Sequence, residues 1–144
     1  MTRISKIKAE DTYKLRKTVL RQGMTLSHKM DGDHKVDTVH LGLFESDLLV
    51  CIASFMKSSR DDFKGTQYQL RGMGTSKAFQ GKGYGTMLMK KAEKLLTSKG
   101  AEVIWCNARV NALDFYRKLG YEIRGEVFDV PQVGPHFVMF KKLA

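Results

Sequence analysis

Thr75-Ser76-Lys77-Ala78-Phe79-Gln80-Gly81-Lys82-Gly83-Tyr84-Gly85-Thr86 is the stretch that decides the fold. A β-rich run leads into it over residues 68–75, and an amphipathic run with helical spacing leaves it over residues 83–99. Alternating glycines let a main chain approach a ligand closely. The first turn of a helix presents free N–H groups and the positive end of the helix dipole. The spacing therefore predicts a phosphate or pyrophosphate site, to which Lys77 and Lys82 add positive charge.

Two common phosphate loops do not fit this stretch. A Walker A loop needs Ser or Thr after its lysine, but Gly83 follows Lys82. A dinucleotide loop needs a third glycine, but Thr86 occupies that place. The pattern Gln/Arg-x-x-Gly-x-Gly/Ala does fit, at Gln80, Gly83 and Gly85. This pattern resembles the acetyl-coenzyme A (acetyl-CoA) loop of the GCN5-related N-acetyltransferases (GNAT), and the alternative is a glycine-rich turn that binds nothing.

A second block follows the apolar run 103–106. It reads Asn107-Ala108-Arg109-Val110-Asn111-Ala112-Leu113-Asp114-Phe115-Tyr116-Arg117-Lys118-Leu119-Gly120-Tyr121. The block is similar to the later GNAT motif, a short helix with a Phe-Tyr pair that ends in Leu-Gly-Phe/Tyr. The resemblance runs from about residue 70 to the C-terminus and more loosely over the N-terminal half. It implies one N-acetyltransferase domain over residues 1–144, of α/β class. The sheet is expected to be mixed and mostly antiparallel, with a central splayed parallel strand pair and about four flanking helices.

The residue patterns predict individual elements. Strands are expected over residues 3–7, 39–44, 48–55, 68–75, 103–106, 121–130 and 137–142. Asp11 is the expected N-cap of a helix to Leu20, and Gly100 and Gly120 are expected to end two later helices. Residues 22–37 are polar and predict a loop or a second short helix, in the region that covers the acceptor site in many GNAT enzymes. Glycines inside the run 68–75, Gly72 and Gly74, predict a bulge or a close backbone approach.

Composition narrows the function classes. The chain has 144 residues, 42% of them apolar, and no apolar run long enough to span a membrane. Cys51 and Cys106 lie in apolar runs and are expected to be buried thiols, and no His or Cys spacing predicts a metal site. No secretory signal is visible, so we expect a cytoplasmic protein. The formal charge of +10 favours anionic partners such as coenzyme A, and the dispersed lysines do not favour nucleic acid.

The resemblance also implies which residues hold acetyl-CoA. The loop amides of Gln80, Gly81, Lys82, Gly83, Tyr84, Gly85 and Thr86 would hold the pyrophosphate. Met73, Gly74 and Thr75 would contact the pantetheine arm, and Lys118 would reach the 3′-phosphate. Many relatives carry an asparagine seven residues before the tyrosine of the second block. Arg109 stands at that place here, so Asn107 or Asn111 would make the cofactor contact that the asparagine makes in those relatives.

Acetyl transfer to an amine also needs an acid and a base. Tyr116 aligns with the family tyrosine that protonates the leaving thiolate, and a tyrosine packed in the core is the alternative. The base is open among His136, His40, Glu45 and Glu126, with His136 favoured because it follows the Pro131–Pro135 loop. Neither cysteine has a nearby histidine in a motif, which favours direct attack of the amine in a ternary complex.

Function beyond the cofactor stays open. The first hypothesis is an N-acetyltransferase acting on a primary amine, with a small metabolite favoured as acceptor. Others are a non-catalytic acyl-CoA-binding regulatory domain and a basic nucleic-acid-binding domain. The basic charge favours an anionic acceptor, such as a phosphosugar, over a histone tail. A homodimer is common in the family, and the sequence does not decide it.

Overall fold

The computed structural model describes residues 1–143 and contains one seven-stranded sheet, in the order β1-β2-β3-β4-β5-β7-β6. The strands are β1 (Thr2–Lys6), β2 (Val39–Glu45), β3 (Leu48–Lys57), β4 (Gln67–Thr75), β5 (Val103–Arg109), β6 (Glu122–Val130) and β7 (Gly134–Lys142). The helical elements are η1 (Ala9–Thr12), α1 (Tyr13–Leu15), η2 (Arg16–Leu20), η3 (Lys77–Phe79), α2 (Tyr84–Ser98), η4 (Val110–Ala112) and α3 (Leu113–Lys118). This is the expected α/β class with a mixed, mostly antiparallel sheet.

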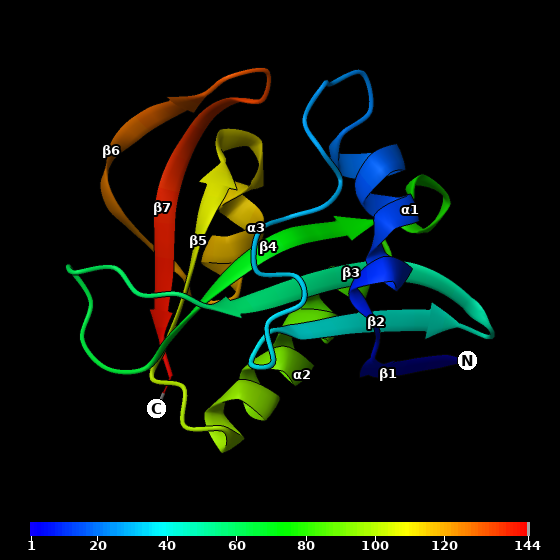
Figure 1. The fold of residues 1–144 in the computed structure, drawn as a ribbon, viewed down its shortest axis with the longest axis horizontal. Helices are drawn as coiled ribbons and strands as arrows, with labels where there is room; N and C mark the ends of the chain where they lie inside the picture. Colours follow the sequence, from blue (N-terminus) through cyan, green and yellow to red (C-terminus); the bar gives the residue numbers. More distant parts are fainter. Residues whose placement is uncertain (144) are drawn as a thin grey trace.

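The central strands β4 and β5 form the parallel pair and then separate. Their pairing covers only Gln67↔Val103 through Leu70↔Cys106. Beyond Leu70, β4 continues to Thr75 and β5 to Arg109 without pairing to each other. Figure 1 shows the two strands diverging at this point. The expected splay is confirmed, and it leaves hydrogen-bonding groups on the inner edges of both strands unpaired by a sheet neighbour.

Helices cover both faces of the sheet (Figure 1). Buried residues of α2, including Leu88 and Met89, pack in one cluster with Leu70 and Cys106 of the central strands, and Tyr116 of α3 joins them. The segment η1–α1–η2 lies against the opposite face, where Arg16 donates a hydrogen bond to Ser54 of β3. Each face of the sheet is therefore covered by its own helical segments, α2 and α3 on one face and η1–α1–η2 on the other.

The helix boundaries follow the local chemistry. The first helical segment begins at Ala9, so the prediction that Asp11 is its N-cap is wrong. Asp11 instead lies in the first turn, where its carboxylate accepts the Lys8 N–H at 2.9 Å. Gly100 and Gly120 follow the ends of α2 and α3 with φ of +91° and +95°, as the sequence predicts.

The neighbouring strands β5 and β7 are both longer than the sequence patterns indicate. β5 runs to Arg109 rather than ending at Cys106, because β7 pairs with it as far as Arg109↔His136. β7 begins at Gly134, which places His136 inside a strand rather than at the end of a loop. Within residues 1–143, no helix has the length and apolar content that crossing a bilayer requires.

Candidate active site

A cavity of about 380 Å³ lies where β4 and β5 separate. Five of the residues predicted to be catalytic or cofactor-binding line it: Met73, Asn107, Asn111, Tyr116 and His136. The rest of its wall comes from Leu20, Arg21, Met30, Gln69, Leu70, Arg71, Gly72, Cys106, Ala108, Arg109, Ala112, Val130 and Val133. The splay thus brings together residues from the strand that precedes the glycine loop, from the second sequence block and from the N-terminal half.

The strand β4 contains the expected bulge at the cavity. Its register shifts between Ile52↔Gly74 and Ser54↔Arg71, so two residues of β4 lie opposite one of β3. Gly72 has φ of +63°, a conformation that glycine adopts without strain. A Cβ at this position would also lie only 3.0 Å from Nε of Arg16. The backbone conformation at position 72 therefore favours glycine, and the buried Arg16 leaves little room for a side chain there.

The glycine loop leads directly into α2. Gly81 and Gly83 have φ of +80° and +79°, and Gly83 is the N-cap of the helix. No side chain caps this helix, so its first-turn N–H groups remain available for an anion. Gly85 is tightly packed, since a Cβ there would lie 3.2 Å from both Met73 Cε and Phe115 Cζ, and these side chains would have to shift. Through Met73 the loop adjoins the cavity, although the loop residues are not part of the cavity wall.

Tyr116 reaches the cavity from the α3 side. Its ring is buried and meets Phe115 and Tyr121 edge-on, at centroid distances of 5.1 and 5.7 Å. Burial raises the pKa of the phenol well above its ordinary value, and this is only partly offset by the charge of Arg109. Within residues 1–143 no hydrogen bond holds the hydroxyl. The phenol is thus protonated and free to donate a proton to a ligand.

The four candidate bases differ in their surroundings. His40 is buried, and both ring nitrogens are engaged, at 2.7 Å to Ser54 Oγ and 2.8 Å to the Asp33 carbonyl oxygen. Glu45 accepts hydrogen bonds from the Tyr84 hydroxyl and the N-terminal amine. The bond from Tyr84 lowers the pKa of Glu45. Glu126 is exposed on β6. Of the four, His136 alone lines the cavity.

His136 has one ring nitrogen engaged. Its Nδ1 lies 2.7 Å from the carbonyl oxygen of Gly134, and a carbonyl can only accept, so Nδ1 carries the hydrogen. In the neutral ring, Nε2 is then left as an acceptor. His136 lies in β7, where it pairs with Arg109 of β5 on one side and with Phe128 of β6 on the other. Its tautomer is thus the one that can take a proton through Nε2.

The remaining predicted residues are placed as follows. Gly74 and Thr75 lie on β4 just beyond the bulge, and the Thr75 carbonyl accepts a hydrogen bond from Gln80 at 3.1 Å. Lys118 is exposed in the last turn of α3, away from the cavity wall. Arg109, at the end of β5, lines the cavity and donates to the Leu20 carbonyl oxygen at 3.1 Å.

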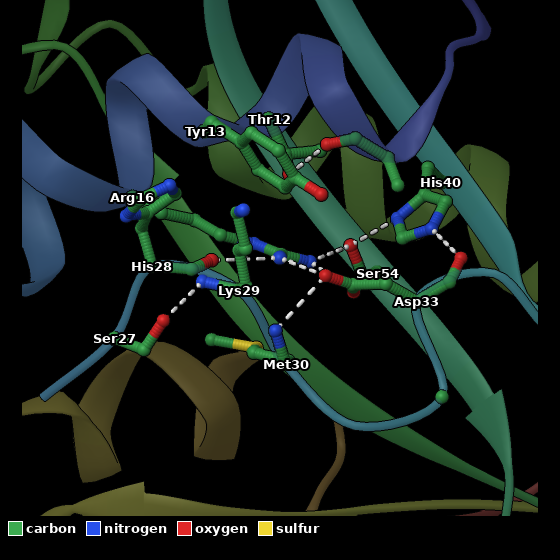
Figure 2. A network of polar contacts seen from close by, with 12 residues as sticks. Thr12, Tyr13, Arg16, Ser27, His28, Lys29, Met30, Asp33, His40 and Ser54 are labelled. Carbon is green, nitrogen blue, oxygen red and sulfur yellow. Dashed lines mark hydrogen bonds and ion pairs between the residues drawn. The ribbon is translucent and has the colours of Figure 1, made fainter.

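A buried polar network holds the segment of residues 28–33, which contributes Met30 to the cavity wall (Figure 2). Arg16 is fully buried, and its guanidinium donates to both carboxylate oxygens of Asp33, at 2.8 and 3.0 Å. It also donates to Ser54 Oγ and to the His28 carbonyl oxygen. Asp33 in turn accepts the N–H of Met30 at 2.9 Å, which fixes a residue of the cavity wall. The sequence patterns did not indicate this network, because its members are spread over residues 16–54.

No three His, Cys, Asp or Glu side chains gather as a metal site in the part of the chain that the structure describes. The cavity wall offers cationic groups, amide side chains, one phenol, one imidazole and one thiol.

Comparisons with known proteins place these features in a family. A model described as the acetyltransferase (GNAT) family matches residues 16–121. A Bacillus subtilis (strain 168) protein, described as the uncharacterized N-acetyltransferase YitI, is 38% identical over 145 residues, covering 99% of this chain and 97% of the relative.

Solved structures share the fold. Escherichia coli ElaA has a TM-score of 0.81 at 22% identity, with 98% of this chain and 99% of that chain covered. An aminoglycoside 6'-N-acetyltransferase complexed with coenzyme A has a TM-score of 0.74 at 17% identity, with 99% and 97% covered.

Proposed function

The chain belongs to the GNAT acetyltransferase family, and from that premise we propose that it transfers an acetyl group from acetyl-CoA to a primary amine, with a small metabolite as acceptor. The observation that carries the proposal is the cavity between β4 and β5, which Tyr116 and His136 enter from different elements. A donor for the leaving group and an acceptor for the amine proton thus border the same space.

The cofactor contacts follow from unpaired backbone groups. The first-turn amides of α2 and the loop from Gln80 to Thr86 suit the pyrophosphate of coenzyme A. The inner edge of β4 from Met73 to Thr75 has no pairing to β5, so it suits the amides of the pantetheine arm. A backbone N–H at the bulge would polarise the thioester oxygen. Asn107 and Asn111 line the same cavity. They would complete the cofactor contacts, with Lys118 at the 3′-phosphate.

The proton transfers belong to His136 and Tyr116. An alkyl amine with a pKa of about 10.4 is less than about one part in a thousand neutral at pH 7, so a base must remove a proton. His136 Nε2 would take that proton, directly or through a water. Acetyl-CoA supplies the activated acyl group as a thioester, and as the carbon–sulfur bond breaks, Tyr116 would donate its proton to the sulfur. The amine nitrogen forms the new bond to the carbonyl carbon, so no acyl-enzyme is needed.

Cys106 is the alternative nucleophile, because it also lines the cavity. Burial raises the pKa of its thiol to about 12, which leaves little thiolate at neutral pH. No base in a nucleophile motif accompanies it. Direct attack by the amine is therefore the mechanism that the cavity favours.

The test is thiol release from acetyl-CoA with a panel of small primary amines. Rate plots with both substrates varied should intersect, as for a ternary complex, whereas an acyl-enzyme gives parallel lines. We expect His136→Gln to lower kcat/KM for the amine by about 10²- to 10⁴-fold. Cys106→Ala should retain turnover. Parallel lines together with an inactive Cys106→Ala variant would refute direct attack, and thiol release with none of the amines would argue against the proposed activity.

A further inference from the structure

Three arginines from separate segments converge on one side of the cavity. Arg21 follows η2, Arg71 lies on β4 beside the bulge, and Arg109 ends β5. The cavity wall contains no aspartate or glutamate among the residues described. This part of the cavity is therefore strongly positive.

The three guanidinium groups lack acidic partners. None of them forms an ion pair within residues 1–143. Arg109 donates to the Leu20 carbonyl at 3.1 Å and Arg21 to the Ser27 carbonyl at 3.3 Å. The Arg71 side chain has no hydrogen-bond partner within residues 1–143. Burial lowers the pKa of Arg21, and the charges of Arg109 and Arg71 lower it further, so the cations lie close enough to repel one another. An anion would relieve this repulsion.

Strand register places these charges beside the proposed base. Arg109 pairs with His136 across β5 and β7, and paired residues share a face of a sheet. Arg71 pairs with Ser54, which contacts Arg16 on the face covered by η2. The cations therefore lie on the same side of the sheet as His136.

The phosphate loop lies elsewhere. Gly85 adjoins Met73 and Phe115, which pack against the core cluster on the α2 face. The pyrophosphate of coenzyme A is accounted for by that loop in the proposed function. The arginines on the opposite face are thus left for a second anion.

The geometry points to an acceptor amine that carries its own anionic group, a carboxylate or a phosphate, bound by Arg71 with Arg21 and Arg109 beside it. This inference rests on the proposed acetyl transfer and names the class of its acceptor. The wall also offers apolar side chains for a short carbon skeleton: Leu20, Met30, Val130 and Val133. At about 380 Å³, shared with the pantetheine arm, the cavity suits a small acceptor.

Matched amines test the inference. β-Alanine is compared with β-alaninamide, and O-phosphoethanolamine with ethanolamine, so that the two arms separate a carboxylate from a phosphate. At least one anionic member should exceed its neutral partner in kcat/KM by about 10- to 100-fold. Arg71→Gln should remove that preference while the KM for acetyl-CoA stays unchanged. Arg3→Gln, which removes an exposed charge on β1, is the matched control and should keep the preference.

A binding measurement separates this inference from the proposed function. The same amines are titrated into protein saturated with coenzyme A, which requires no turnover. Tighter binding of an anionic member, lost in Arg71→Gln, supports the inference even if no acetyl transfer is seen. Equal binding of the anionic and neutral members, or an Arg71→Gln variant that behaves like Arg3→Gln, would overturn it.

Discussion

Replacing Tyr116 with phenylalanine is expected to lower kcat by about 10²- to 10⁴-fold, the usual contribution of a positioned general acid. The Kd for acetyl-CoA should stay unchanged, because the proposed cofactor contacts are backbone amides and other side chains. Burial raises the pKa of Tyr116, so the phenol is a weaker acid than in water and a stepwise transfer to a thiolate of pKa about 8.5 is uphill. The proton should therefore move as the carbon–sulfur bond breaks. Because the pKa of Tyr116 is raised above its ordinary value of about 10, ionisation of the phenol should not reduce the activity below about pH 10.

Tyr121→Phe is the matched control for this variant. Tyr121 is also buried and packs against Tyr116, but its hydroxyl donates to Glu93 and it does not line the cavity. Its loss should leave kcat near the wild-type value. Equal turnover in Tyr116→Phe and wild type would contradict the assigned acid. Absence of turnover in the wild type, with acetyl-CoA binding retained, would favour a non-catalytic acyl-CoA-binding domain.

Replacing Asp33 with alanine is expected to lower the free energy of unfolding by about 3–5 kcal/mol. The change leaves the Arg16 guanidinium fully buried without its carboxylate, and Nε of Arg16 already has no hydrogen-bond partner within residues 1–143. Urea unfolding measures the loss. Asp62→Ala is the control, since its ion pair with Arg60 is partly exposed and should cost less than about 1 kcal/mol.

A double variant and a pH series sharpen this test. Arg16→Met with Asp33→Leu should recover much of the lost stability, because apolar groups of similar volume can replace a buried ion pair. Burial alone would raise the pKa of Asp33, but the hydrogen bonds from Arg16 and the Met30 N–H outweigh it and lower the pKa. The stabilisation is then complete above the unfolded pKa of about 3.9 and is lost as the pH falls through the folded pKa. If the Asp33→Ala variant were as stable as Asp62→Ala, this result would contradict a structural role for the ion pair between Arg16 and Asp33.

The parts predictable from sequence are those set by local spacing. The glycine pattern at Gln80, Gly83 and Gly85 predicted the strand-to-helix turn, because left-handed φ values and a helix start are local properties. Gly72 indicated the bulge for the same reason. The splay between the central strands was expected instead from the resemblance to the GNAT family, since no local pattern marks it.

The parts that sequence patterns missed depend on tertiary convergence. Arg21 and Arg71 are 50 positions apart in the chain, and only the packing of η2 against β4 brings them to one cavity. Arg16 resembles an ordinary surface cation in an amphipathic helix, yet it is fully buried because Asp33 and Ser54 meet it. The end of β5 was missed because its polar residues are held in the sheet by β7, a partner that local pattern does not reveal.

The most direct test of the account is thermal unfolding of the protein with acetyl-CoA, with free coenzyme A, and with ATP as a control. At 100 times its Kd, a ligand of the native state should stabilise it by about 2.7 kcal/mol, a shift in Tm of roughly 2–8 °C for a domain of this size. We expect this shift with acetyl-CoA and coenzyme A and none with ATP. An unchanged Tm with both coenzyme A compounds would contradict cofactor binding between β4 and β5, and with it the proposed acetyl transfer.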